Sequence, residues 1–374
     1  MAEPRRGDPG VPERSLPETR RRPFDSVLFL TRIGHFVAAI FLFILAIQLM
    51  KKGAQAVAPR LQGTFPFDNG VSTMGLGWLG AYLVLSGSPV AAVSLSLFAA
   101  NATTRMQTFT MLTGSRLGAS FIVLLVGFLY AMRSRKRRES IGMGVLALSM
   151  TALVYVPGMF LAYGLLRSGA LNGINWTTSA ELNGAIDAVW GPIVRVADQL
   201  LPGPLLFPLG LAVILVSFKL LDLVLPSLDG EKHASSRREW LQKPWPMFFL
   251  GSLAALLTLS VSVALTILVP LASKGYVRRE QAIPYIAGAN ITTLADTLVA
   301  AMILRNPIGV HVVLAEAIGV AIITLVLLAF LYRPLCRTVI ALDDWIVETT
   351  PRLVVFVAVL FVLPLALVFS GRLL

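Results

Sequence analysis

Apolar runs of about 18 residues or longer recur along most of the chain, separated by shorter polar or basic stretches. Runs of this length predict membrane-spanning helices, because about 20 apolar residues cross the hydrocarbon core of a bilayer in helical form. The pattern predicts full spans over residues 28–50, 106–132, 141–166, 205–225, 281–304, 310–332 and 353–370.

Two further apolar stretches, residues 70–100 and 246–274, contain small or hydroxyl residues near their middle. The first is about 30 residues long, which is more than one span needs. We therefore predict a re-entrant hairpin in each, turning at residues 86–89 and 260–263. One kinked span is the alternative for the first stretch.

One sequence pattern occurs twice, at a constant offset of 174 residues. In each copy a Ser-x-Ser pair stands 28 positions before the glycine that opens a small-residue segment, which we expect to interrupt a span. The paired positions are Ser86, Ser88 and Gly114, and Ser260, Ser262 and Gly288. Because three spans is an odd number, the second copy must enter the membrane from the opposite face. The predicted fold is an all-α polytopic membrane protein with an inverted repeat, each half having three full spans and one re-entrant hairpin, plus a final C-terminal span.

The prediction divides the chain into five segments. These are a disordered basic cytoplasmic tail (1–26), a first transmembrane repeat (27–166), an extracytoplasmic connection (167–204), a second, inverted repeat (205–332), and an amphipathic segment with the last span (333–374). Asp343, Asp344 and Glu348 are expected on a solvated helix in the last segment.

Basic residues orient this arrangement in the membrane. Most of the 32 Lys and Arg fall on the side that the prediction assigns to the cytoplasm, with the N-terminus inside. Lys51 and Lys52 oppose this orientation. We expect a multi-pass protein of the cell (inner) membrane.

Composition excludes several classes of protein. The chain is 56% hydrophobic and only 14% charged, with a mean hydropathy of +0.76, so a soluble domain could not cover its surface. The net charge of +12 comes from clusters beside apolar spans, which argues against nucleic-acid binding. A single cysteine, Cys336, excludes an internal disulfide. Without a metal-ligand cluster or a nucleophile–base pair, neither an enzyme nor a cofactor is expected.

Small and hydroxyl residues in the hairpins and interrupted spans are candidates for binding. Interrupted helices expose N–H groups, which suit anions, and carbonyls, which suit sodium, while hydroxyls suit both. The solute-binding candidates are Ser86, Gly87, Ser88, Gly114, Ser115, Arg116, Ser260, Ser262, Gly288, Asn290, Thr292 and Thr293. The coupling-ion candidates are Ser120, Thr258, Asp296 and Glu316. Close helix packing is the alternative role for the small residues.

Charged residues inside the spans narrow the candidate chemistry. Arg116 is suited to pairing with an anionic solute. Asp296 could hold a coupling cation or neutralise Arg116, and Glu316 could do either. A buried Arg116–Asp296 pair without any ligand is the alternative. Lys219 lies near a span end and is expected to extend to the interface.

The two hairpin motifs, residues 83–88 and 258–262, and the two interrupted spans, residues 114–120 and 288–293, resemble the sodium-dependent phosphate cotransporter (Na/Pi cotransporter) family. In that family each half carries a Gln-Ser-Ser-Ser hairpin and a Gly-Ala-Asn-Ile-Gly-Thr-Thr break. The resemblance covers roughly residues 37–330. It implies sodium-coupled phosphate symport by alternating access. The implied partners are phosphate or another small inorganic anion, sodium and the lipid bilayer, with a homodimer as an option.

Departures from the family pattern keep the ion and the solute open. Leu85 and Leu259 stand where the family has glutamine, Gly87 and Val261 replace the central serines, Thr292 replaces a glycine and Arg116 replaces an asparagine. A divergent member could instead carry another anion, with proton coupling through Asp296 or Glu316. It could also be a membrane scaffold or regulatory subunit that has lost transport.

Overall fold

A computed structural model describes residues 26–61, 67, 69–133, 137–174, 176–224, 243–258, 260–273 and 275–370. In these ranges the chain is helical and contains no strand. The first half comprises α1 (Ser26–Leu61), α2 (Gly70–Val84), α3 (Gly87–Ala99), α4 (Arg105–Ala119), α5 (Phe121–Arg133), α6 (Arg137–Ser168) and α7 (Ala180–Leu200). After a 3-10 turn, η1 (Gly203–Leu205), the second half comprises α8 (Leu206–Val224), α9 (Pro244–Thr258), α10 (Val261–Thr266), α11 (Leu268–Ser273), α12 (Arg279–Thr292), α13 (Leu294–Ile303), α14 (Pro307–Phe330), α15 (Tyr332–Glu348) and α16 (Thr350–Phe369).

Seven helical segments in the described ranges are long and apolar enough to cross a membrane. They are Thr31–Leu61, Arg105–Met132, Arg138–Ser168, Gly203–Leu221, Arg279–Ile303, Pro307–Phe330 and Thr350–Phe369. The number and order of spans predicted from hydropathy are therefore confirmed by length and composition. The shorter apolar helices α2, α3, α9, α10 and α11 fall where the two hairpins were predicted.

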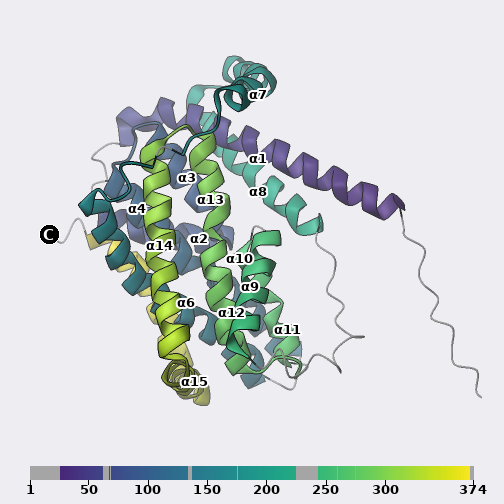
Figure 1. Ribbon diagram of the computed structural model, residues 1–374, viewed down its shortest axis with the longest axis vertical. Coiled ribbons are helices and arrows are strands. Elements are labelled where there is room, and N and C mark those ends of the chain that lie inside the picture. Colours follow the sequence, from purple (N-terminus) through teal and green to yellow (C-terminus); the bar gives the residue numbers. More distant parts are fainter. Residues whose placement is uncertain are drawn as a thin grey trace, which may run out of the picture.

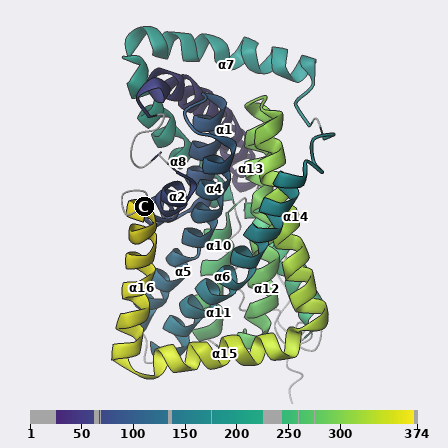
Figure 2. The ribbon, with the colours of Figure 1, turned by 90° about the vertical axis from the view of Figure 1, so that its left-hand side faces the viewer.

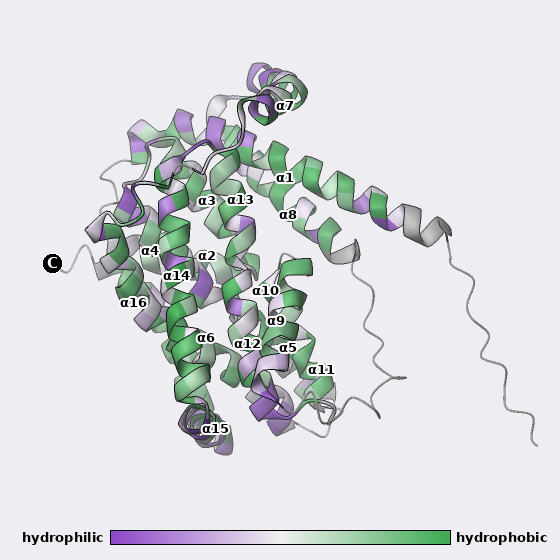
Figure 3. Ribbon diagram, in the orientation of Figure 1, coloured by the Kyte–Doolittle hydropathy of each residue, from purple (hydrophilic) through white to green (hydrophobic). Residues whose placement is uncertain are grey.

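Most of the spans form an upright bundle that is bounded by a transverse helix at each end (Figure 2), whereas α1 and α8 slope out to one side of it (Figure 1). Helix α7 lies across one end and α15 across the other, while α1 and α8 lie side by side (Figures 1 and 2). Apolar residues dominate the upright helices, and hydrophilic residues concentrate toward the ends (Figure 3). This distribution is the one expected when lipid surrounds the middle of the bundle.

Close helix contacts repeat at the offset found in the sequence. Gly77 of α2 lies against the Met111 carbonyl of α4, and Gly251 of α9 lies against the Tyr285 carbonyl of α12. Gly114 and Gly288 make the reciprocal contacts, with the carbonyls of Met74 and Phe248. A Cβ at any of these glycines would collide with backbone, so only glycine permits this separation of the helices.

Helix starts repeat in the same way. The Gln107 side chain accepts a hydrogen bond from the backbone N–H of Thr104 (2.7 Å), and the Gln281 side chain accepts one from that of Arg278 (2.8 Å). These glutamines satisfy N–H groups that the first turn of a helix leaves free. The equivalent helices α4 and α12 of the two halves therefore share local hydrogen bonding as well as packing.

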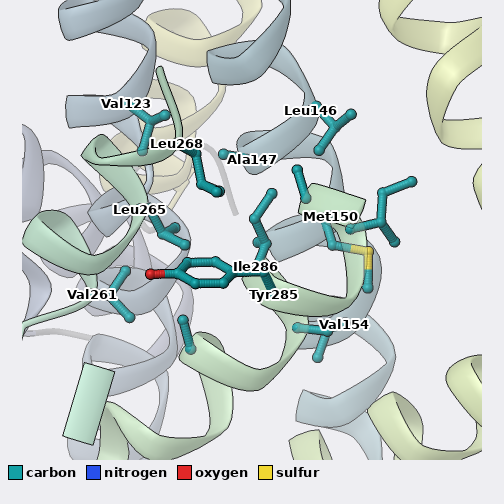
Figure 4. Packing of buried hydrophobic residues seen from close by; sticks show 14 of the residues in the cluster. Val123, Leu146, Ala147, Met150, Val154, Val261, Leu265, Leu268, Tyr285 and Ile286 are labelled. Carbon is teal, nitrogen blue, oxygen red and sulfur yellow. The ribbon is translucent and has the colours of Figure 1, made fainter. Parts of the chain in front are cut away.

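An apolar core joins the two halves around α6. Val123 of α5 and Met150 and Val154 of α6 pack in one cluster with Leu265 of α10 and Ile286 of α12 (Figure 4). The second-half helices are thus buried against helices of the first half. Packing of this kind holds the hairpin α9–α11 next to α5, α6 and α12.

Two expectations are corrected by the fold. The spans change helix at Ser120 and Thr293, the last residues of the small-residue segments rather than their glycines, because those glycines lie in continuous helix and serve close packing. Asp343 is buried and paired with Arg279, not solvated, because α15 packs against α6 and α12. The expected tail (all but its last residue) and Leu259 lie outside the described residues.

Candidate functional site

The tips of the two hairpins meet inside the bundle. Helix α2 ends at Val84, and the next residue, Leu85, has a φ of 57° that turns the chain into α3. The Leu85 carbonyl, free at this helix end, accepts a hydrogen bond from the Ser262 hydroxyl of α10 at 3.0 Å. Ser260 caps α10 by accepting a bond from the Val263 N–H (3.3 Å), and Ser86 stands at the equivalent start of α3. The motif serines thus lie where the two halves touch.

Arg116 of α4 is the largest fully buried side chain near these tips. Its Nη1 donates to the hydroxyls of Ser88 (3.4 Å) and Thr293 (3.2 Å). Its Nη2 donates to Thr297 and lies 3.6 Å from Oδ1 of Asp296. Every neighbour in this set is an oxygen acceptor, as a guanidinium requires. One charged group thereby joins α3, α4, α12 and α13.

Several polar atoms at this centre lack a protein partner. Nε of Arg116 and Oδ2 of Asp296 make no hydrogen bond, although both side chains are almost completely buried. Glu316 of α14 is fully buried and neither of its carboxylate oxygens has a hydrogen-bond partner. Such groups are costly within a membrane, so their presence indicates a site for a ligand, an ion or a proton.

A second polar network lies beside the first and also joins both halves. The Asn290 amide donates to Thr151 (3.2 Å), whose hydroxyl shares a hydrogen bond with Ser120 (2.6 Å). Tyr155 donates to the Asn290 carbonyl at 2.8 Å, and its ring is within electrostatic range of Arg116. These contacts connect α6 to the ends of α4 and α12.

Other binding candidates predicted from the sequence pack against backbone or bond to main-chain carbonyls. Gly114 and Gly288 meet neighbouring backbone, and Gly87 lies against the Ser115 carbonyl. The remaining hydroxyls bond main-chain carbonyls: Ser115 to Leu112, Thr292 to Ser252 and Thr258 to Ser260. Of the predicted set, the structure brings Ser88, Arg116, Thr293 and Asp296 together by direct contacts, with Glu316 nearby.

Sequence reasoning missed Thr297, Thr151 and Tyr155. Thr297 stands one helical turn after Thr293 and beside Asp296, so the i, i+4 spacing of hydroxyls within an apolar span was an available signal. Thr151 and Tyr155 have the same spacing on α6, but nothing in the sequence places α6 against α12. No group of three or more His, Cys, Asp or Glu that could hold a metal occurs among the described residues. The oxygens around Arg116 are of the hard type that suits sodium.

The fold and this centre define a class of protein. It is a multi-span helical membrane protein with a buried, charged, hydroxyl-lined centre between two similar halves, as transporters have. Residues 213–364 match a family model described as Na+/Pi-cotransporter. No match was found among curated proteins or among solved structures.

The matched segment runs from α8 into α16 and contains Thr293, Asp296 and Glu316. The family resemblance stated from the sequence is confirmed for this part of the chain. The family is one of transporters rather than enzymes, and with the seven candidate spans the match supports a membrane transporter. Arg116 lies outside the matched segment.

Proposed function

We propose that this protein is a secondary active transporter that couples sodium to the symport of inorganic phosphate. The two halves act as inverted repeats. The solute binds between them and crosses the membrane by alternating access. The N-terminus lies on the cytoplasmic side of the cell (inner) membrane, as the distribution of basic residues favours. The match to the Na+/Pi-cotransporter family supports this choice of solute and ion.

The observation that carries the proposal is the buried guanidinium of Arg116. It lies where helices of both halves meet, and its Nε is free of any protein partner. A planar guanidinium with a free N–H is suited to an oxyanion, because its N–H groups match the oxygens of phosphate. The hydroxyls of Ser88 and Thr293 lie beside it and can donate to the same anion.

Coupling of sodium to this site would use the oxygens that now face Arg116. Asp296 and Thr297 supply a carboxylate and a hydroxyl within one turn of α13. Ser120 and Thr258 bond elsewhere, so we assign the coupling cation to the Asp296 side of the centre. Movement of one half against the other would open this centre to each side in turn.

Uptake into proteoliposomes tests the proposal. Purified protein should accumulate labelled phosphate under an inward sodium gradient, and an equal potassium gradient should give no accumulation. Arg116→Ala should abolish uptake, while Gly164→Ala, at a glycine with nothing within 4 Å of an added Cβ, should leave it unchanged. Absence of uptake for every inorganic anion tried would favour a non-transporting scaffold or regulatory subunit.

A second candidate is anion transport coupled to protons. The specific observation in its favour is Glu316, which is fully buried and has two carboxylate oxygens without partners. A carboxyl in that condition is suited to carrying a proton. Uptake driven by an inward proton gradient without sodium would establish this candidate in place of the first.

A further inference from the structure

The anion site proposed above is already occupied by an anion that belongs to the chain. Asp296 places Oδ1 3.6 Å from Nη2 of Arg116, and both side chains are almost fully excluded from the surface. Thr297 donates to the same carboxylate oxygen at 2.9 Å. A solute anion must therefore compete with the Asp296 carboxylate for the guanidinium.

The two anions cannot easily share one guanidinium in a low-dielectric centre. With both bound, the group would carry one positive and two negative charges, before Glu316 is counted. Like charges a few ångströms apart cost several kcal/mol where the dielectric constant is low. Either Asp296 withdraws from Arg116, or its charge is removed.

The structure provides space for withdrawal. Asp296 borders a partly open cavity of about 380 Å³ lined by residues of α1, α7, α8 and α13. The rest of its lining is apolar except for Thr178, and includes Phe43, Ile186, Phe218 and Met302. Asp296 therefore lies between the Arg116 guanidinium and this cavity, and its Oδ2 has no hydrogen-bond partner.

An ionised carboxylate could not remain in that cavity. Apolar walls offer no hydrogen-bond donors for a charge and no set of oxygens for a sodium ion. A protonated carboxyl needs only one acceptor, and Thr178, whose hydroxyl donates to Asn183, is the other polar residue beside the cavity. Withdrawal of Asp296 therefore requires a proton.

We propose that the solute anion and Asp296 exchange places at Arg116, and that Asp296 leaves as a neutral acid, so one proton is taken up with each anion bound. The proton comes from the medium and joins a carboxylate oxygen of Asp296, while Arg116 keeps its charge. With a monovalent anion such as dihydrogen phosphate, the centre then carries the same net charge before and after binding. This inference rests on the proposed anion site. A sodium ion bound together with the anion would then use the hydroxyls of Thr293 and Thr297 in place of the Asp296 carboxylate.

Other titratable groups around Asp296 are few. Arg116 faces it from α4, and Tyr155 of α6 lies within electrostatic range of it. Glu316 of α14 interacts with Arg116 and Tyr155 and is the rival proton acceptor. The cavity-lining side chains of α1, α7 and α8 carry no charge. The test must therefore distinguish Asp296 from Glu316.

Calorimetric titration with inorganic phosphate in buffers of different ionisation enthalpy measures the protons taken up per anion. The full-length protein in detergent should take up about one proton more than Asp296→Asn does under identical conditions. The comparison cancels any proton that phosphate itself gains or loses. Because the competing charge is absent, Asp296→Asn should bind phosphate roughly 5- to 150-fold more tightly, the usual range for coupled sites.

Two further variants make the test decisive. Glu316→Gln should keep the extra proton, because the exchange uses Asp296. Ile186→Phe, which adds volume at a buried wall of the cavity, should weaken phosphate binding at least several-fold by blocking withdrawal. Equal proton uptake by wild type and Asp296→Asn, or loss of the extra proton only in Glu316→Gln, would overturn the inference while leaving the anion site standing. If neither phosphate nor sulfate binds to wild type or to Asp296→Asn, the proposed function fails and the inference falls with it.

Discussion

Arg116 and Asp296 form a buried ion pair, with 3.6 Å between Nη2 and Oδ1, although one lies on α4 and the other on α13. The pair couples the two halves of the chain at the point where their hydroxyl residues converge. The strength of this pair affects the stability of the protein, and its replacement by a solute anion would determine whether the centre binds that anion.

Removal of Arg116 alone should destabilise the protein strongly. Arg116→Ala leaves Asp296 as an unpaired buried charge, and breaking a buried pair in this way costs about 3–5 kcal/mol. The double variant Arg116→Ala/Asp296→Asn should recover most of that loss. Thermal unfolding in one detergent compares the four proteins of the cycle. Equal loss in the single and double variants would contradict a stabilising pair.

The glycine contacts should be intolerant of any side chain. Gly77→Ala and Gly251→Ala place a Cβ against the carbonyls of Met111 and Tyr285, and overpacking of this kind costs about 1–3 kcal/mol. Gly164→Ala is the matched control, because an added Cβ there meets nothing within 4 Å. Thermal midpoints should fall for the first two variants and stay the same or rise for the control. A similar change in all three would argue against close packing at the paired sites.

Contact between the hairpin tips predicts a specific cross-link. In a Cys336→Ser background, Leu85→Cys with Ser262→Cys should form a disulfide or react with a short bifunctional reagent, since these residues share a 3.0 Å hydrogen bond. Leu85→Cys with Ser273→Cys is the control, because Ser273 ends α11 at the far end of the same hairpin. Mobility on a non-reducing gel reports the result. Cross-linking of the control pair alone would mean that the tips do not meet.

Stability should fall as the pH rises from about 4 to 6, because of Asp343 on α15. Burial raises the pKa of the Asp343 carboxyl to about 6, and the Arg279 guanidinium 2.8 Å away only partly opposes this. The unfolded chain has the ordinary value near 4, so between these values the folded protein binds more protons and is favoured at the lower pH.

Asp343→Asn removes the titrating group and should flatten this part of the stability curve. Thermal midpoints measured at intervals between pH 4 and pH 7 provide the comparison. Asp344→Asn is a suitable control, because Asp344 also pairs with Arg279 but is about half exposed. A slope that persists unchanged in Asp343→Asn would assign the pH dependence to another group.

Much of the architecture was predictable from local pattern. Apolar runs identified the spans because a bilayer imposes a minimum length on any crossing helix. The repeated Ser-x-Ser and glycine positions identified equivalent segments, and glycine contacts such as Gly77–Met111 and Gly251–Tyr285 obey the same offset. The serines were predicted at the turns of the two hairpins, and in the structure Ser86 and Ser260 stand at the starts of α3 and α10.

The site was only partly predictable, because its contacts join distant helices. The sequence shows Arg116 and Asp296 as isolated charges in apolar surroundings, and it left open whether they pair with a solute or with each other. It suggested open backbone at Gly114 and Gly288, whereas the fold uses both glycines for close packing. It gave no reason to connect Thr151 or Tyr155 of α6 with Asn290 of α12.

The sequence by itself determined where helices long and apolar enough to span a membrane occur, that a set of serine and glycine positions repeats at a constant offset, and that a few charged and hydroxyl residues lie within those helices. Those properties follow from the length of the apolar runs, from the spacing of the repeated positions, and from the free-energy cost of placing polar residues in lipid. Only the tertiary structure decided that Asp296 reaches Arg116 from one side and borders an apolar cavity on the other. Which acceptor a buried charge finds depends on how helices cross, and crossing is set by packing of the whole bundle.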